Sequence, residues 1–308
     1  MKKCFHLIVT SFPKKIWVCL LLISVKLTAQ EIDTSITMLA EPILISAQFS
    51  FTEGPAADKA GNVFFTDQPN NKIWKFDTKG KISLFAENAG RANGMYFDAS
   101  GNLITCSDEK NQLLSINPEG KISVLVNDFK GHQLNGPNDC WIDKKGGVYF
   151  TDPYYQRDYW ERKNPDTALG GQKVYYLAKK SKKAIVAAED FKKPNGIVGT
   201  SNGKNIFVSD IGAGKIYKYT IGADGSLSDR QLFVQNLADG MTTDNTGNLY
   251  LAGNGVTIYT ASGIKLQHID VPAKWTANIC FGGSDHDILF ITASESVFIM
   301  PMKVKGSN

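Results

Sequence analysis

Cysteine is scarce in this sequence, with 5 cysteines in 308 residues. Two of them, Cys4 and Cys19, lie in an N-terminal segment that we expect to be removed. A chain of this length can bury a large core without covalent cross-links, so no disulfide framework is expected. Cys140 and Cys280 occupy equivalent places in two repeats that would face each other across a ring, whereas bridged Cα atoms lie about 4.4–6.8 Å apart. We therefore expect them, like Cys106, to be buried apolar side chains.

Long apolar runs are absent beyond the N-terminus. The run at residues 16–25 follows several lysines and is too short to span a bilayer core of about 30 Å. It precedes Leu27-Thr-Ala29, a small-residue cleavage site typical of a secretory signal peptide. We predict that residues 1–29 direct export to the periplasm or the exterior; an uncleaved anchor is the alternative. Residues 30–308 would then form the mature protein.

Excess charge of one sign is also absent from the mature chain. The formal net charge of +4 includes five lysines and no acids within residues 1–29, so it falls to −1 when that segment is removed. A near-neutral domain lacks the basic surface that binds nucleic acid, and we expect no membrane association after cleavage. Pro/Ser-rich linkers, low-complexity runs and long amphipathic helices are also missing, which favours a single domain over residues 30–308.

One pattern is repeated six times. In the copy at residues 138–152, a polar residue precedes an apolar strand, a glycine turn and a second strand that ends on an acid. In the first five copies the polar residue lies 8 positions before the turn glycine. Aligned on their turns, the copies place only polar, oxygen-bearing side chains in this column: Glu53, Asn93, Asn138, Asn195, Asp239 and Asn278.

Repeats of about forty residues that consist of short strands are typical of a β-propeller. Six such units predict an all-β fold with six four-stranded blades. The column would then surround the central channel, where a metal or substrate site is expected. Residues 43–49 can form a further strand, which we expect to pair with the last unit, residues 279–303, and to close the ring. Because closure protects sheet edges, a monomer is the expected state.

The third repeat is about a dozen residues longer than the others. The excess follows Asp152 and is rich in aromatic residues, including Tyr154, Tyr159 and Trp160. Loops of this length in compact domains are commonly functional. It is expected either to cover a substrate as a lid or to pack against a neighbouring blade.

The chemistry of the column favours a hard cation. Glu53 and Asp239 offer carboxylates, while Asn138 and Asn195 offer amide oxygens. Oxygen ligands without cysteine or histidine favour Ca²⁺ or Mg²⁺ over Zn²⁺. The alternative is that the Asn-Gly and Asp-Gly pairs only form turns. The acids that end the second strands are expected to cap local amides, with a direct contact to the site as the alternative for Asp210; these acids are Asp67, Asp108, Asp152 and Asp210.

Several motifs together resemble the gluconolactonase/regucalcin family. They are Phe51-Thr-Glu-Gly-Pro55, Leu134-Asn-Gly-Pro-Asn-Asp139 followed by Tyr149-Phe-Thr-Asp-Pro153, Pro194-Asn-Gly196, Asp239-Gly-Met241 and Phe281-Gly-Gly283. The resemblance covers essentially the whole mature chain. It implies a six-bladed β-propeller with one central divalent cation held by Glu53, Asn138, Asn195 and Asp239. Ca²⁺ is the first expectation, with Mg²⁺, Zn²⁺ and Mn²⁺ as alternatives.

Two departures from that family stand out. An arginine that commonly precedes the Asn-x-Pro-Asn-Asp motif is missing, since the sequence there is Gly131-His-Gln-Leu134. An arginine clamp on a sugar acid is therefore not evident. The column contains no histidine, which argues against paraoxonase-like chemistry, and His132 is expected to be a solvated loop side chain rather than a catalyst.

The resemblance implies hydrolysis of a sugar lactone or similar cyclic ester. The cation would polarise the ring carbonyl and activate a water, with Asp239 as general base. Substrate hydroxyls would be oriented by Asn93, Asn135 and Asn278, with Tyr154 on the covering loop. The alternatives are a metal-dependent phosphotriesterase or fluorophosphatase, a non-catalytic sugar-binding propeller stabilised by the metal, and a strictosidine-synthase-like enzyme.

Overall fold

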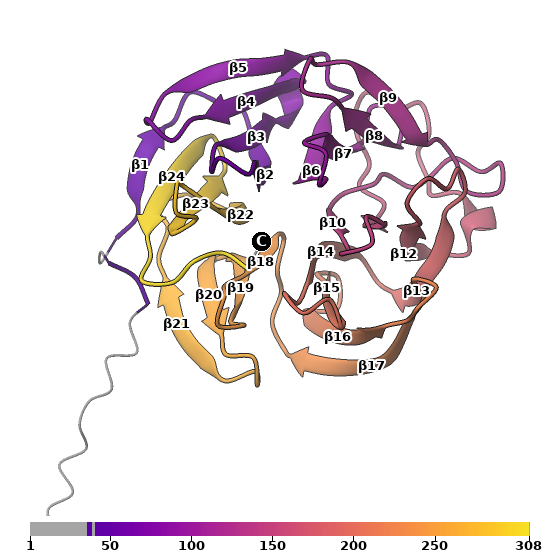
Figure 1. The fold of residues 1–308 in the computed structure, drawn as a ribbon. Coiled ribbons are helices and arrows are strands. Elements are labelled where there is room, and N and C mark those ends of the chain that lie inside the picture. The colour runs from indigo at the N-terminus through magenta and orange to yellow at the C-terminus, as the bar shows by residue number, and fades with distance from the viewer. Residues whose placement is uncertain (1–35, 39–40, 308) are drawn as a thin grey trace, which may run out of the picture. The chain divides into compact units, whose positions relative to one another are not determined.

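The computed structural model describes residues 36–38 and 41–307. Within this part of the chain, the strands form six four-stranded antiparallel sheets arranged around a central axis (Figure 1). The predicted six-bladed β-propeller is confirmed. The expected signal peptide at residues 1–29 lies outside the described residues and stays a prediction. No helix in the described ranges is long and apolar enough to cross a membrane.

Each blade is an antiparallel meander whose first strand lies nearest the axis (Figure 1). The first blade contains β2 (Thr52–Ala57), β3 (Val63–Asp67), β4 (Lys72–Phe76) and β5 (Ile82–Glu87). The second contains β6 (Ala92–Phe97), β7 (Leu103–Ser107), β8 (Gln112–Ile116) and β9 (Ile122–Val126). The third contains β10 (Cys140–Ile142), β11 (Val148–Asp152), β12 (Gln172–Leu177) and β13 (Ile185–Phe191). The fourth contains β14 (Pro194–Gly199), β15 (Asn205–Asp210), β16 (Lys215–Ile221) and β17 (Leu227–Val234). The fifth contains β18 (Met241–Thr243), β19 (Leu249–Gly253), β20 (Gly255–Tyr259) and β21 (Lys265–Ile269). Two short 3₁₀ helices are also described: η1 (Gln68–Asn70) follows β3, and η2 (Thr167–Leu169) precedes β12.

The sixth blade closes the ring. It contains β22 (Thr276–Gly282), β23 (Ile288–Ala293) and β24 (Ser296–Pro301), and its fourth strand is β1 (Ile43–Ser46) from the other end of the domain. Leu44 pairs with Phe298, which confirms the predicted pairing of the two ends. At the end of the channel opposite the column, the C-terminal tail crosses between blades, with Gly306 N donating to His286 O at 2.8 Å and Ser307 N to Thr243 O at 3.1 Å.

The apolar core lies between neighbouring blades. The second strand of a blade is buried on both faces, as in β3 and β11, where all five residues are buried. The largest apolar cluster joins the third, fourth and fifth blades through residues such as Trp141, Phe207 and Leu249. Cys106, Cys140 and Cys280 are buried free thiols, as expected.

The column residues lie at or near the start of the innermost strands. The residue directly after each of them determines how closely neighbouring blades can approach at the axis. A Cβ atom on Gly54 would lie 1.9 Å from Asn93 O, and one on Gly196 would lie 2.4 Å from Asp239 O. The pairing of β2, β6 and β14 shifts register at the column residue, which is the local bulge expected where a side chain is re-aimed. The Asn-Gly and Asp-Gly pairs therefore join blades at the axis rather than forming hairpin turns.

Replacing Gly54 with Ala is expected to destabilise the protein by at least about 2 kcal/mol. The residue has φ of +48° and its added methyl group would collide with backbone atoms of the second blade. Gly80→Ala is the matched control, because Gly80 has φ of +84° and open space around its missing Cβ. Urea unfolding of both variants measures the difference. Equal losses would show that only the left-handed backbone matters, not the contact between blades.

Candidate active site

Five of the six column residues line one cavity at the axis. The cavity has a volume of about 300 Å³ and is lined by Glu53, Asn93, Asn138, Asn195 and Asp239. Phe51, Gln68, Pro69, Tyr155 and Arg157 complete its wall. Larger cavities, of about 440, 430, 380 and 340 Å³, lie elsewhere on the described part of the chain, and none of them is lined by a column residue. The spacing of the repeats thus correctly predicted that these side chains lie together in the fold.

The two carboxylates of the cavity are held by neighbouring blades. Glu53 is buried, and its Oε2 accepts from Gly54 N and from Asn278 Nδ2, the latter at 3.1 Å. Asp239 is partly buried, and its Oδ2 accepts from the indole Nε1 of Trp275 at 2.6 Å. Both carboxylates keep lone pairs for another partner, because a carboxylate offers about four acceptor positions.

The amides of the cavity are less satisfied than its acids. Asn195 donates through Nδ2 to the hydroxyl of Tyr155 at 3.0 Å. Asn93 Oδ1 is buried without a hydrogen-bond partner among the described residues. The side chain of Asn138 is also buried and makes no hydrogen bond within the part of the chain that the structure describes. Buried amides normally find partners, so this arrangement points to a ligand at the site.

Burial and mutual repulsion raise the pKa values of the acids around the axis. The pKa of Glu53 lies well above its usual value, chiefly because of burial and then because of the nearby charges of Asp239 and Asp139. Burial raises the pKa of Asp239 to about 6, opposed by hydrogen bonds from Trp275 and Asn195. Clustered carboxylates of this kind are stabilised in their charged form when a cation lies among them.

Asp139 is a member of this acid cluster that the sequence analysis did not single out. Its carboxylate accepts from Cys140 N at 2.9 Å and from Ile197 N at 3.3 Å, and burial raises its pKa to about 7. A signal was present in the sequence, because Asp139 occupies the place that glycine takes after most other column residues.

The donor set fits a hard divalent cation. Glu53 and Asp239 supply two carboxylates, and Asn138 and Asn195 supply amide oxygens on the same cavity. Oxygen donors of mixed charge are the ligands that Ca²⁺ and Mg²⁺ prefer. Among the described residues there is no cluster of three or more His, Cys, Asp or Glu side chains with a metal-binding arrangement. The fit of this donor set to a divalent cation therefore depends on the amide oxygens of Asn138 and Asn195.

Three of the predicted substrate-binding residues lie outside the cavity wall. Asn278 stands behind Glu53 and donates to it. Asn135 is buried, and its Nδ2 donates to Asp152 O and Gly171 O, both at 3.3 Å. Tyr154 turns away, with its hydroxyl bonded to Gln156 and its ring 5.8 Å from that of Trp160. Tyr155, its neighbour, lines the cavity instead.

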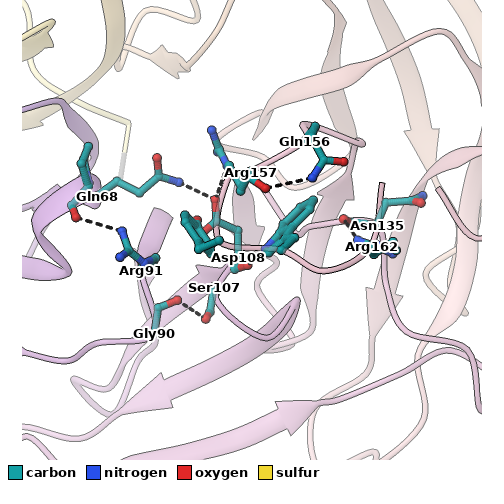
Figure 2. Close-up of polar contacts among 12 residues, drawn as sticks. Gln68, Gly90, Arg91, Ser107, Asp108, Asn135, Gln156, Arg157 and Arg162 are labelled. Carbon is teal, nitrogen blue, oxygen red and sulfur yellow. Dashed lines mark hydrogen bonds and ion pairs between the residues drawn. The ribbon is translucent and has the colours of Figure 1, made fainter. Parts of the chain in front are cut away.

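The base of the long loop of the third blade is attached to the segment that precedes β10. Arg162 holds its base by donating to Leu134 O at 3.0 Å and to Asn135 O at 2.5 Å (Figure 2). His132 lies outside the cavity and pairs with Asp166 at 3.1 Å, with 45% of its side chain exposed. Its expected place as a solvated loop residue agrees with this position.

Comparison with known proteins places the chain in a family. The model for the SMP-30/gluconolactonase/LRE-like region matches residues 51–295. The chain belongs to the SMP-30/gluconolactonase/LRE-like family. The matched region runs from the motif containing Glu53 to beyond Asn278, so it includes every column residue.

Relatives of this family resemble the chain over most of its length. A gluconolactonase of Zymomonas mobilis is 28% identical over 293 residues, which cover 85% of this chain and 82% of that protein. A solved gluconolactonase from Xanthomonas campestris is 25% identical with a TM-score of 0.80, covering 87% of this chain and 91% of that one. A regucalcin from Agrobacterium tumefaciens, titled a calcium-binding protein, has a TM-score of 0.71 at 18% identity, covering 86% and 95% of the two chains, and shows the shared fold.

Proposed function

We propose that this protein is a divalent-metal-dependent lactonase that opens a sugar lactone or a related cyclic ester by hydrolysis. One observation carries the proposal: Glu53, Asn138, Asn195 and Asp239, from four blades, line a single cavity on the axis. Family membership and the relatives named gluconolactonase support the reaction type. Unpartnered amides and clustered acids support the dependence on a cation.

Each residue of the cavity has a distinct task in this proposal. Glu53, Asn138, Asn195 and Asp239 would hold the cation, which when bound supplies Lewis-acid polarisation of the ester carbonyl. Asp239 accepts the proton of the attacking water on a lone pair that is not engaged by Trp275. The Trp275 indole fixes the orientation of that carboxylate through its 2.6 Å hydrogen bond. Asn93, with its unpartnered Oδ1, accepts from a substrate hydroxyl.

Removal of the metal ion is expected to lower the rate of lactone opening at least about a hundredfold, because Lewis-acid polarisation contributes several kcal/mol. The ring-opening rate is followed by acid release for protein dialysed against a chelator and for the same protein resupplied with Ca²⁺ or Mg²⁺. Elemental analysis of each sample confirms its metal content. Full activity in metal-free protein would contradict the proposal, and so would tight lactone binding without turnover in the metal-loaded form.

A further inference from the structure

Asp108, which directly follows β7, behaves differently from the acids that end the second strands of other blades. Three of these acids cap pairs of backbone amides, as predicted: Asp67 accepts from Ser50 and Phe51, Asp152 from Asn135 and Gly136, and Asp210 from Lys192 and Lys193. In the second blade the equivalent amide, Arg91 N, donates to Asn71 Oδ1 at 2.7 Å instead. The expectation that Asp108 caps local amides is wrong. Ser107, which pairs with Ala92, occupies the strand-end position that Asp67 and Asp210 occupy in their blades, and Asp108 lies one residue beyond it.

Asp108 instead binds side chains from two other blades. Its side chain is 3% exposed, and its Oδ2 accepts from Arg157 Nε at 2.6 Å and from Gln68 Nε2 at 2.7 Å (Figure 2). Oδ1 accepts from the hydroxyl of Tyr159 at 2.5 Å, and its backbone oxygen accepts from Trp160 Nε1 at 2.6 Å. A buried carboxylate with these contacts fixes the segment 155–160 in place.

Arg157 is held at one edge only. Its Nε is bound by Asp108, while its two Nη atoms donate to none of the residues that the structure describes. The side chain is 27% exposed and lines the axial cavity. The free edge of a guanidinium presents parallel N–H groups that match the two oxygens of a carboxylate.

Basic side chains lie near Tyr155 and Tyr159 of the loop, whereas the charged column residues of the cavity are acids. Lys193 Nζ lies 4.4 Å from the centre of the Tyr155 ring, and the Arg157 guanidinium lies 5.9 Å from the same ring. Arg91 stacks on Tyr159 at 4.2 Å, on the outer side of the segment. Glu53 and Asp239, by contrast, are the charged groups among the column residues. A ligand in the cavity thus meets the cationic side chain of Arg157 at the loop and the acids Glu53 and Asp239 at the column.

We propose that Arg157 is a specificity-determining residue that binds a carboxylate carried by the lactone away from the ester being opened, with Asp108 as its positioning residue. The substrate class is then monolactones of sugar diacids, which keep one free carboxylate, in preference to neutral sugar lactones. This inference rests on the proposed lactonase function. No arginine directly precedes the motif that contains Asn138. In this proposal Arg157, from the loop of the third blade, binds the carboxylate instead.

The test compares two probes that differ in one group. D-glucaro-γ-lactone carries a free carboxylate, and D-glucono-γ-lactone carries a hydroxymethyl group in its place. The wild-type protein is expected to show a higher kcat/KM for the glucaro-lactone. Arg157→Gln is expected to lower this value about tenfold to a hundredfold, mainly through KM, because a charge-assisted hydrogen bond is lost. The effect on the glucono-lactone is expected to stay within about threefold.

Matched variants separate charge from structure. Arg230→Gln removes the same charge from an exposed outer strand and is expected to change neither probe. Asp108→Asn is expected to reduce the preference for the glucaro-lactone in the wild-type background and to have no further effect on it when combined with Arg157→Gln. Asp210→Asn, which makes the same change at the strand end of the fourth blade, is expected to leave the preference intact.

The outcomes distinguish this inference from the function on which it rests. Hydrolysis of neither probe by the metal-loaded wild type would count against the lactonase function itself. Hydrolysis of both probes, with a preference that Arg157→Gln leaves unchanged, would overturn the role of Arg157 alone. If Asp108→Asn fails to fold, as judged by its thermal unfolding, the Arg157→Gln kinetics on the two probes decide the question.

Discussion

Replacing Asp239 with Asn is expected to lower kcat for lactone opening by about a hundredfold to ten-thousandfold while the ion remains bound. An amide keeps one oxygen for the cation but has no lone pair basic enough to take a proton from water, and general-base catalysis contributes factors of this size. The indole of Trp275, which donates to Asp239 Oδ2, also meets an acceptor of lower charge. Stopped-flow acid release on metal-loaded variant and wild type measures the loss.

Two controls make the Asp239→Asn result specific. Asp210→Asn makes the same chemical change in the neighbouring blade, where the carboxylate accepts from the backbone amides of Lys192, Lys193 and Ala213, and it is expected to keep kcat. The metal content of each variant is measured before the assay. A kcat within threefold of wild type, with the ion present, would show that another group accepts the proton.

Replacing Glu53 with Gln is expected to weaken cation binding at least about a hundredfold, since carboxylate count sets the affinity of oxygen-ligand sites. The same change should stabilise the metal-free protein, because it removes a buried carboxylate that Asp239 and Asp139 repel. The gain in stability on adding metal should shrink accordingly, by about 2.7 kcal/mol for a hundredfold loss of affinity. Calorimetric titration and thermal unfolding with and without metal test both effects.

Glu87→Gln is the matched control for the Glu53 variant. Glu87 lies on the outermost strand of the same blade, and its exposed side chain pairs with Lys72 at 3.4 Å. An exposed pair of this kind contributes little, so cation affinity and unfolding should both stay near the wild-type values. Unchanged cation affinity in Glu53→Gln would show that the ligand assignment is wrong.

The sequence by itself determined the ring and the column. Six copies of one pattern predict six blades, because each copy can bury its apolar faces only against a neighbouring copy. The constant offset from column residue to turn glycine predicts that Glu53, Asn138, Asn195 and Asp239 occupy equivalent places, and equivalent places around a ring face its axis. Closure of the last blade by residues from the start of the domain also followed, because an unpaired strand edge is unfavourable.

Only the tertiary structure decided which other side chains reach the cavity. Tyr155 rather than Tyr154 lines it, and Arg157 reaches it from a loop whose path depends on Asp108 in another blade. Asp108 lies one residue beyond the repeat position of Asp67 and Asp210, which Ser107 occupies in the second blade, and it binds side chains from two other blades instead of backbone amides. Such contacts between residues far apart in the chain leave no periodic signal in the sequence. They arise where loops of different blades meet, and there the contacts depend on three-dimensional packing rather than on repeat position.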